Sequence, residues 1–244
     1  MSAHPRRCAP LFNLVSRAAL WCALPLATAS ASASVCYGTV AAGRLEGGAQ
    51  LPAHGTNYVP YSSLGVSLGR TYVHQAVRDI VVDAYAAAAA STPKTRFMYG
   101  ETGLETGGQF NPHRTHQSGL SVDFMVPVID GSGRSVLLPT NTLNKFGYDL
   151  EFDSSGALGD LRIDFEAMAE HLYQLAEAAK KHNVNIEKVI FQKELVTLLL
   201  RTKRGSYLRD KVSFMKATPW IRHDEHYHVD FYLPCRALAK YGKP

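Results

Sequence analysis

The sequence predicts an α+β fold, and three observations support this prediction. Segments with helical and strand-like periodicity follow one another without the regular alternation of a βαβ chain. The chain has 244 residues, 46% of them hydrophobic and 19% charged, which is enough for one domain with a sizeable core. No stretch approaches the ~18 consecutive apolar residues that a membrane-spanning helix needs. We therefore expect one globular domain of mixed helices and strands.

The first half of this domain is expected to contain a long helix, a strand and a glycine-rich loop. Residues 34–70 are rich in Gly, Ser and Pro and are expected to be irregular. Apolar residues at helical spacing predict a helix over 71–91, which Pro93 ends. A strand is predicted at 96–99. Four glycines within 100–111 indicate a loop with unusual backbone angles or a close approach to a ligand.

The second half is expected to begin with a buried strand at 120–128. Asp164 is a suitable N-cap for a helix that runs to about His182 and carries a long apolar stripe. His171 and His182 lie off this stripe, so we expect both side chains to be solvated and without a function. The remaining predicted elements are a short strand at 189–191, a short apolar helix at 194–200, a solvated basic loop at 201–211 and a final strand at 227–233.

The N-terminus has the layout of a secretory signal peptide. Three arginines precede a short apolar run at 18–29, and small Ala and Ser residues follow it. We predict a signal peptide at 1–33 with cleavage after Ala33, which leaves a single domain at 34–244; an uncleaved anchor is the alternative. Removing three arginines from the 26 basic residues leaves 23 against 21 acidic residues, a formal +2. This balance gives no reason to expect nucleic-acid binding.

Two cysteines remain after the predicted cleavage, one near each end of the domain. Cys36 and Cys235 form an even pair in an exported protein, which favours a disulfide over two free thiols. In the chain-entropy account, a bridge that closes so long a loop stabilises the fold by roughly 4–5 kcal/mol, less any strain in the folded state.

A group of histidines lies close to the C-terminus, in the sequence His-Asp-Glu-His-Tyr-His-Val-Asp at 223–230. Side chains two residues apart on a strand share a face, so His226, His228 and Asp230 are expected to point the same way. Two imidazoles on one strand face suit a transition metal. Alone, a His-x-His pattern is weak evidence for a metal site.

A second group lies in the middle of the chain, at 113–123. His116 and Asp123 are seven residues apart across a turn at Gly119, so a loop histidine and a strand aspartate can converge. With His228 they make a set of two nitrogens and one oxygen. Such a set leaves the fourth tetrahedral position open for water, as a catalytic zinc site requires, whereas structural zinc sites are usually closed by cysteines.

These two groups carry a family resemblance. The pattern H-x-x-H-Q-x-G-L-x-V-D at 113–123 resembles a motif of the penicillin-insensitive murein endopeptidases, and H-D-E-H-Y-H-V at 223–229 is similar to that family's H-D-D-H-F-H-V. The likeness covers about 35–235. The family belongs to a wider group of zinc peptidases that includes the lysostaphin-type peptidases and the D-alanyl-D-alanine dipeptidases.

The resemblance implies one zinc ion per chain, with His116, Asp123 and His228 as ligands, on a small antiparallel sheet flanked by helices. It implies a periplasmic endopeptidase that cuts peptidoglycan cross-links at diaminopimelate, with no stable membrane anchor after signal cleavage. The two terminal cysteines match a bridge typical of the family. Members of the family can bind a further metal, but residues 117–163 contain no histidine to complete such a site.

The remaining polar residues of the two groups receive candidate roles. His226 is the first candidate for the general base, since it shares a strand face with the ligand His228. Glu225 is the alternative base, although a regular strand would turn it away from the metal. His223 could donate to the oxyanion or bind substrate. His113 could contact substrate or a ligand.

Asp230 has two open roles. It could orient an imidazole, as carboxylates near metal sites do, or it could pair with an arginine. The family resemblance gives no guidance on Asp230, because the family commonly has Arg at this position. The family also differs at Glu225, where it has Asp.

Two other functions stay open at this point. A D,D-carboxypeptidase or dipeptidase of the same zinc group would have to hold a free terminal carboxylate, for which Arg114 and Arg222 are available. The chain could also be a non-catalytic zinc module that binds the cell wall. The retained His226, His223 and Glu225 favour an enzyme over such a module.

Overall fold

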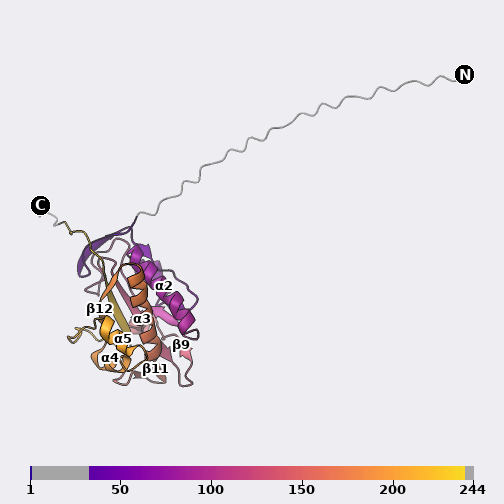
Figure 1. Cartoon of the computed structure of the whole chain (residues 1–244), viewed down its shortest axis with the longest axis vertical. Coiled ribbons are helices and arrows are strands. Elements are labelled where there is room, and N and C mark those ends of the chain that lie inside the picture. Colours follow the sequence, from indigo (N-terminus) through magenta and orange to yellow (C-terminus); the bar gives the residue numbers. More distant parts are fainter. Residues whose placement is uncertain (2–32, 240–244) are drawn as a thin grey trace. The chain divides into compact units, whose positions relative to one another are not determined.

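The computed structural model describes Met1 and residues 33–239, and every helix and strand of these residues lies in the second stretch (Figure 1). Apart from its end residues Met1 and Ala33, the predicted signal peptide at 1–33 lies outside the described residues. Within the described part of the chain, no helix combines the length and the apolar character needed to cross a membrane.

A five-stranded sheet forms the centre of the fold, in the order β12-β13-β7-β6-β4. Neighbouring strands are antiparallel except for β4 and β6, which run parallel. The predicted α+β class is therefore confirmed, with one parallel pair at the edge of the sheet. The strands are β4 (Tyr58–Pro60), β6 (Phe97–Tyr99), β7 (Ser121–Met125), β12 (Asn185–Ile190) and β13 (His226–Tyr232).

Two long helices, α2 (Gln75–Ser91) and α3 (Phe165–Lys181), lie side by side over one face of this sheet (Figure 1). The predicted cap of α3 is present, because the Asp164 side chain accepts a hydrogen bond from the Ala167 backbone. Helix α2 begins four residues later than predicted. The residues before it pair as a short strand, and His74 caps the helix.

The N-terminal segment 34–70 is more regular than predicted. Its first two strands form a hairpin, which approaches the end of the chain through the backbone pair of Cys36 and Arg236. The predicted disulfide between Cys36 and Cys235 is present. The periodicity of the segment is weak because its strands are short and largely half-buried. Its elements are β1 (Val35–Thr39), β2 (Ala42–Glu46), β3 (Ala49–Gln50), β4 and helix α1 (Ser63–Ser67), with β5 (Tyr72–Val73) as the partner of β3.

The predicted strand at 120–128 is divided between two sheets. After β7 the chain leaves the central sheet and enters a four-stranded one, in the order β10-β11-β8-β9. In the sequence, a 3₁₀ segment, η1 (Thr142–Gly147), follows β9 and precedes β10 of this second sheet. Its strands are β8 (Val128–Ile129), β9 (Ser135–Val136), β10 (Ala157–Leu158) and β11 (Leu161–Ile163).

Two short helices, α4 (Lys193–Leu199) and α5 (Gly205–Lys211), complete the fold. The second one lies in the segment that was predicted to be a solvated basic loop, so that prediction was wrong. Leu208 of α5 is fully buried, and Arg204 at its start pairs with Glu170 of α3. The sequence does not reveal this helix, because seven residues with one buried apolar side chain give no clear helical period.

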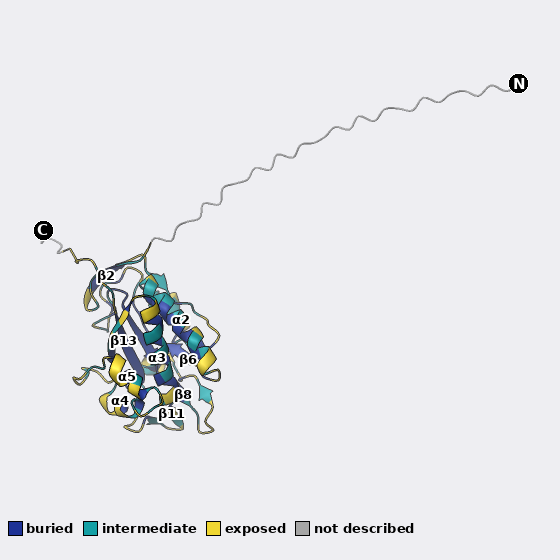
Figure 2. Ribbon diagram, in the orientation of Figure 1, coloured by how far each residue is buried: buried dark blue, intermediate teal, exposed yellow. Residues whose placement is uncertain are grey.

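The core lies between the central sheet and the two long helices. The buried residues, dark blue in Figure 2, follow the central strands and the inward faces of α2 and α3. His171 of α3 is among them, which corrects the expectation that it is solvated. Its ring stacks on Tyr85, and its Nδ1 lies 2.5 Å from the Tyr227 hydroxyl. His182 is partly exposed and pairs with Asp83.

Candidate active site

The two predicted motifs meet on the central sheet, on the face opposite α2 and α3. Strands β7 and β13 are adjacent, and Asp123 lies directly across from His228. The neighbouring residue Tyr227 points to the helix side, where it meets His171. Because successive side chains on a strand alternate between faces, Asp123 and His228 occupy the other side. There His228 Nδ1 lies 2.8 Å from Asp123 Oδ1.

His116 reaches the same carboxylate from a loop. Its backbone has a φ of 68°, in the left-handed region that costs a non-glycine residue about 1 kcal/mol or more. Gly103 packs against it so closely that a Cβ would come within 2.7 Å of the His116 carbonyl oxygen. The glycine-rich loop predicted at 100–111 therefore permits a close approach of backbone to backbone at this position.

The hydrogen bonds of His116 determine its tautomer. Its Nδ1 lies 3.1 Å from the Thr102 carbonyl oxygen, which can only accept, so Nδ1 carries the proton. Its Nε2 is buried, has no hydrogen-bond partner among the described residues, and lies 3.3 Å from Asp123 Oδ1. Burial lowers the pKa of His116, so the imidazole is neutral and its Nε2 lone pair faces the carboxylate.

Asp230 contacts the ring nitrogen of His228 that does not face Asp123. Asp230 Oδ1 lies 2.7 Å from His228 Nε2 and accepts from Ser121, and the other carboxylate oxygen pairs with Lys188. Burial lowers the pKa of His228, but the charge of Asp230 and the hydrogen bonds of Asp123 and Asp230 outweigh it and raise the pKa to about 10. Of the two roles left open for Asp230, the structure favours the orientation of an imidazole.

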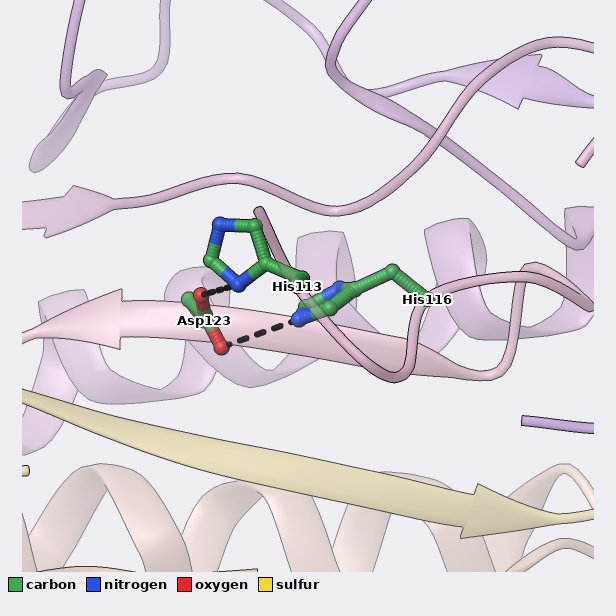
Figure 3. Close-up of side chains that lie close together, drawn as sticks. All are labelled: His113, His116 and Asp123. Carbon is green, nitrogen blue, oxygen red and sulfur yellow. Dashed lines mark ion pairs between the residues drawn. The ribbon is translucent and has the colours of Figure 1, made fainter. Parts of the chain in front are cut away.

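His113 lies near His116, beside the Asp123 carboxylate (Figure 3). Its Nδ1 lies 3.8 Å from Asp123 Oδ2, and its Nε2 lies 2.6 Å from Glu101. His113, His116 and Asp123 can each offer one ligand atom, with all three atoms within 4.8 Å of one another. The structure therefore adds His113 to the groups around the carboxylate that could hold a metal ion.

Glu101 is a buried residue of the site that was not singled out from the sequence. Its carboxylate accepts from the Tyr61 hydroxyl at 2.8 Å and is paired with Arg70 and His113. Burial raises the pKa of Glu101, but the hydrogen bonds from His113 and Arg70 outweigh it and lower the pKa to about 2. An acid two residues after the end of the predicted strand, within the glycine-rich loop, was the available signal.

Tyr148 is the second residue that the sequence did not reveal. Its hydroxyl accepts from the Glu101 backbone N–H at 2.9 Å and donates to Asp123 Oδ2 at 3.0 Å. Burial, together with the charge of Asp123, raises the pKa of Tyr148 well above its usual value, so the hydroxyl keeps its proton. Nothing in the sequence near this tyrosine marks it, because its partners lie on β7 and on the loop before it.

Glu225 and His226 form a hydrogen-bonded pair, with 2.7 Å between Glu225 Oε1 and His226 Nδ1. A regular strand would turn Glu225 away from the site, but β13 begins only at His226, and the Glu225 side chain lines the same cavity as His226. Burial lowers the pKa of His226, but the charges of Glu225 and Asp123 outweigh it and raise the pKa. The free Nε2 of His226 lies 3.9 Å from Asp123 Oδ2.

His223 stands beside this pair, with its ring centre 4.6 Å from that of His226. Its Nδ1 lies 2.8 Å from the Ile221 carbonyl oxygen, so Nδ1 carries the proton and Nε2 is an acceptor. Burial lowers the pKa of His223 to about 3, which keeps it neutral. Of its two proposed roles, binding a substrate N–H fits this tautomer, whereas donation to an oxyanion does not.

The residues around Asp123 fit a metal ion. A buried imidazole nitrogen without a hydrogen-bond partner is costly, and His116 Nε2 is such an atom within the described part of the chain. It faces Asp123, whose pKa lies well below its ordinary value. Burial raises this pKa, but the charge of His226 and the hydrogen bond from His228 outweigh the effect of burial. The donors available are imidazole nitrogens and one carboxylate, which are the ligands of catalytic zinc sites.

A comparison with known families agrees with the two motifs. The family model described as penicillin-insensitive murein endopeptidase matches residues 36–240. The chain belongs to this family. The match spans both histidine groups and nearly all of the described domain, so the resemblance seen in the motifs is confirmed. No curated protein matches the sequence at a significant level.

As a member of a murein endopeptidase family, the chain is a peptidase, and its site opens into a cavity of about 510 Å³. Most of the histidines and acids described above line this cavity: Glu101, His113, Asp123, His223, Glu225, His226 and His228. Its walls come from helix α1, from the 3₁₀ segment η1, and from the loop before β13. Prominent wall residues are Leu64, Leu68, Arg114, Lys145, Trp220, Ile221 and Arg222.

Proposed function

We propose that this peptidase is a zinc-dependent murein endopeptidase that hydrolyses peptide cross-links of peptidoglycan at diaminopimelate. The observation that carries the proposal is the set of imidazoles around one buried carboxylate, next to a carboxylate–imidazole pair and open to a cavity. Family membership supports the endopeptidase activity. The donor set supports a metal, and the residue types favour zinc.

His116, Asp123 and His228 are the proposed ligands of one zinc ion. His116 would bind through Nε2 and His228 through Nδ1, because their other ring nitrogens are engaged with Thr102 and Asp230. Such outer hydrogen bonds are typical of metal-binding histidines. When bound, the ion supplies a Lewis acid that polarises the scissile carbonyl and makes water a stronger acid.

His226 is the proposed general base. Its Nδ1–H is donated to Glu225, which leaves the Nε2 lone pair directed toward the Asp123 carboxylate and able to take a proton from water. Once Nε2 has taken the proton, the hydrogen-bonded Glu225 carboxylate stabilises the imidazolium until it delivers the proton to the leaving amine. Glu225 thus acts through His226, as the carboxylate does in other acid–base pairs.

Export to the periplasm is part of the proposal. The Cys36–Cys235 disulfide fits an oxidising compartment, and a murein substrate lies outside the cytoplasm. The predicted signal peptide at 1–33 and the mature domain at 34–244 would account for the export. The partner is then peptidoglycan itself.

The experiment is mass spectrometry of purified cross-linked muropeptides after incubation with zinc-loaded protein comprising residues 34–244. We expect dimers to be split into monomers, and a chelator to stop the reaction until zinc is restored. Release of terminal alanine alone, with dimers left intact, would show a carboxypeptidase. Binding of muropeptides without any turnover would show the non-catalytic module.

A further inference from the structure

Four lysine and arginine side chains of the described residues line the cavity, and three of them are paired with acidic neighbours. Arg70 is paired with Glu101, Lys145 with Asp149 and Arg222 with Asp224. Arg222 also donates to the Phe152 carbonyl oxygen, so its guanidinium is engaged in holding two loops together.

Arg114 is the fourth, and it is different. Among the residues that the structure describes, none forms a hydrogen bond or an ion pair with its guanidinium. It stacks instead on the indole of Trp220, with 4.5 Å between the guanidinium carbon and the ring centre. Stacking of this kind holds a guanidinium in place while it leaves the N–H donors at its edge free.

The stacked pair of Arg114 and Trp220 lies close to the residues of the candidate active site. Arg114 follows His113 in the first motif, and Trp220 lies three residues before His223 of the second. Both side chains line the cavity that contains Asp123. The stacked pair therefore joins the two loops that carry the site, at the exposed side of the cavity.

The surface around Arg114 is apolar. Trp220 is 55% exposed and Ile221 is 51% exposed, and Leu64 of α1 and Leu68 at its C-cap are exposed on the same cavity. Large apolar side chains gathered on an open cavity indicate a binding surface. A ligand that fits has aliphatic carbons to cover these side chains and one negative group for Arg114.

We propose that Arg114 binds a free carboxylate of the substrate peptide close to the scissile bond, while Trp220 and Ile221 cover the adjoining aliphatic carbons. This inference rests on the proposed function. Guanidinium and carboxylate are geometrically matched for two parallel hydrogen bonds. In a cross-link the carboxylate can belong to diaminopimelate, or it can be the terminal carboxylate of the peptide.

The test compares steady-state cleavage of three zinc-loaded proteins: wild type, Arg114→Gln and Arg114→Lys. The substrates are a cross-linked muropeptide dimer, the same dimer amidated at the diaminopimelate carboxylate, and the same dimer amidated at its terminal carboxylate. Arg134→Gln is the matched control, since Arg134 is an exposed arginine in the β8–β9 turn, is paired with Asp130 and does not line the cavity.

For wild type we expect amidation of one of the two carboxylates to raise KM about tenfold with little change in kcat, and the sensitive position identifies the source. Arg114→Gln should raise KM for the unmodified dimer to a similar extent and lose the discrimination. Arg114→Lys should recover part of it, because the charge remains but the planar fork is lost. Added salt should raise KM for wild type more than for Arg114→Gln.

A second variant, Trp220→Leu, keeps an apolar surface but removes the ring under the guanidinium. We expect it to show part of the Arg114→Gln effect on KM. The inference is overturned if wild type cleaves all three dimers equally well, or if Arg114→Gln behaves like Arg134→Gln. Failure of the proposed function would look different, because wild type would then leave even the unmodified dimer intact.

Discussion

His116 and His171 are both fully buried, and their comparison shows what separates a site from a core. In each, Nδ1 is engaged and Nε2 has no hydrogen-bond partner among the described residues. Around His171 the neighbours are aromatic rings, with Tyr85 stacked on it and Phe97 beside it. His116 Nε2 instead faces Asp123 at 3.3 Å. An unsatisfied buried imidazole indicates a ligand only where a carboxylate and further donors converge on it.

The difference also appears in the backbone. His171 lies in the middle of α3, where regular helical geometry places it against the sheet. His116 lies on a loop in a left-handed conformation, and Gly103 is needed beside it. Strain of this kind is retained where the surrounding structure requires a side chain in one orientation.

The largest expected effect comes from removing the carboxylate that the imidazoles share. Asp123→Asn keeps the size of the side chain but removes the charge that faces His116 and His228. We expect the purified variant to lose its zinc, and activity to fall to that of chelated protein. This loss should exceed the ~10²–10⁴-fold that a missing general base costs.

Metal analysis and muropeptide cleavage are the two measurements. His116→Ala serves as a second variant and should behave alike, and circular dichroism establishes that both are folded. Full zinc content in both variants would place the metal elsewhere and would remove the distinction between His116 and His171.

The next largest effect is expected for the proposed base, and it distinguishes His226 from the proposed zinc ligands. His226→Ala should retain zinc and lose kcat by ~10²–10⁴-fold, since it removes the proposed base but no proposed ligand. Glu225→Gln keeps a partner for His226 Nδ1 but removes its charge, so we expect a smaller loss of about 10–100-fold. The measurement is kcat of the zinc-loaded proteins. A larger loss for Glu225→Gln than for His226→Ala would exchange the two roles.

The smallest effect on activity is expected for the core histidine. His171→Phe retains an aromatic ring among Tyr85, Phe97 and Phe124, and it should leave zinc content and kcat unchanged. A drop in either would mean that burial among rings does not make a histidine inert.

The same variant should change the pH dependence of stability. Burial lowers the pKa of His171 from 6.5 to about 3, so below pH 6.5 the unfolded chain takes up a proton that the folded chain refuses. The free energy of unfolding therefore falls as pH decreases toward 3. Between pH 7 and pH 5 wild type should lose about 2 kcal/mol more than His171→Phe. Urea unfolding of the metal-free proteins at both pH values measures this difference.

Local patterns were sufficient for much of the fold. The Asp164 cap and the apolar stripe of α3 depend on residues within one or two turns, so the helix was predicted nearly to the residue. Strand alternation placed His226, His228 and Asp230 on one face for the same reason. Helix α5 and the N-terminal hairpin were missed because short elements have no period to detect, and their stability comes from contacts with distant segments.

The site divides in a similar way. The spacing of His116 and Asp123, and the His-x-His of β13, marked the chemistry because each pattern is local. Glu101 and Tyr148 were not marked, since they act through hydrogen bonds to β7 and its neighbouring loop that only the folded chain forms. The direction of the Glu225 side chain stayed open, because it depends on where β13 begins. Pairing with β7 sets that start, and the sequence of β13 alone does not reveal it.

The sequence by itself thus determined to which family the motifs point and which side chains are the candidates for the site. It did so because residue types, strand alternation and helix capping act over a few positions. Only the tertiary structure decided which nitrogen of each imidazole is free, that His171 belongs to the core, and that Arg114 differs from the other described cations of the cavity in having no acidic partner. Hydrogen bonds and ion pairs decide these points, and their partners come from segments as far apart as Thr102 and Asp230.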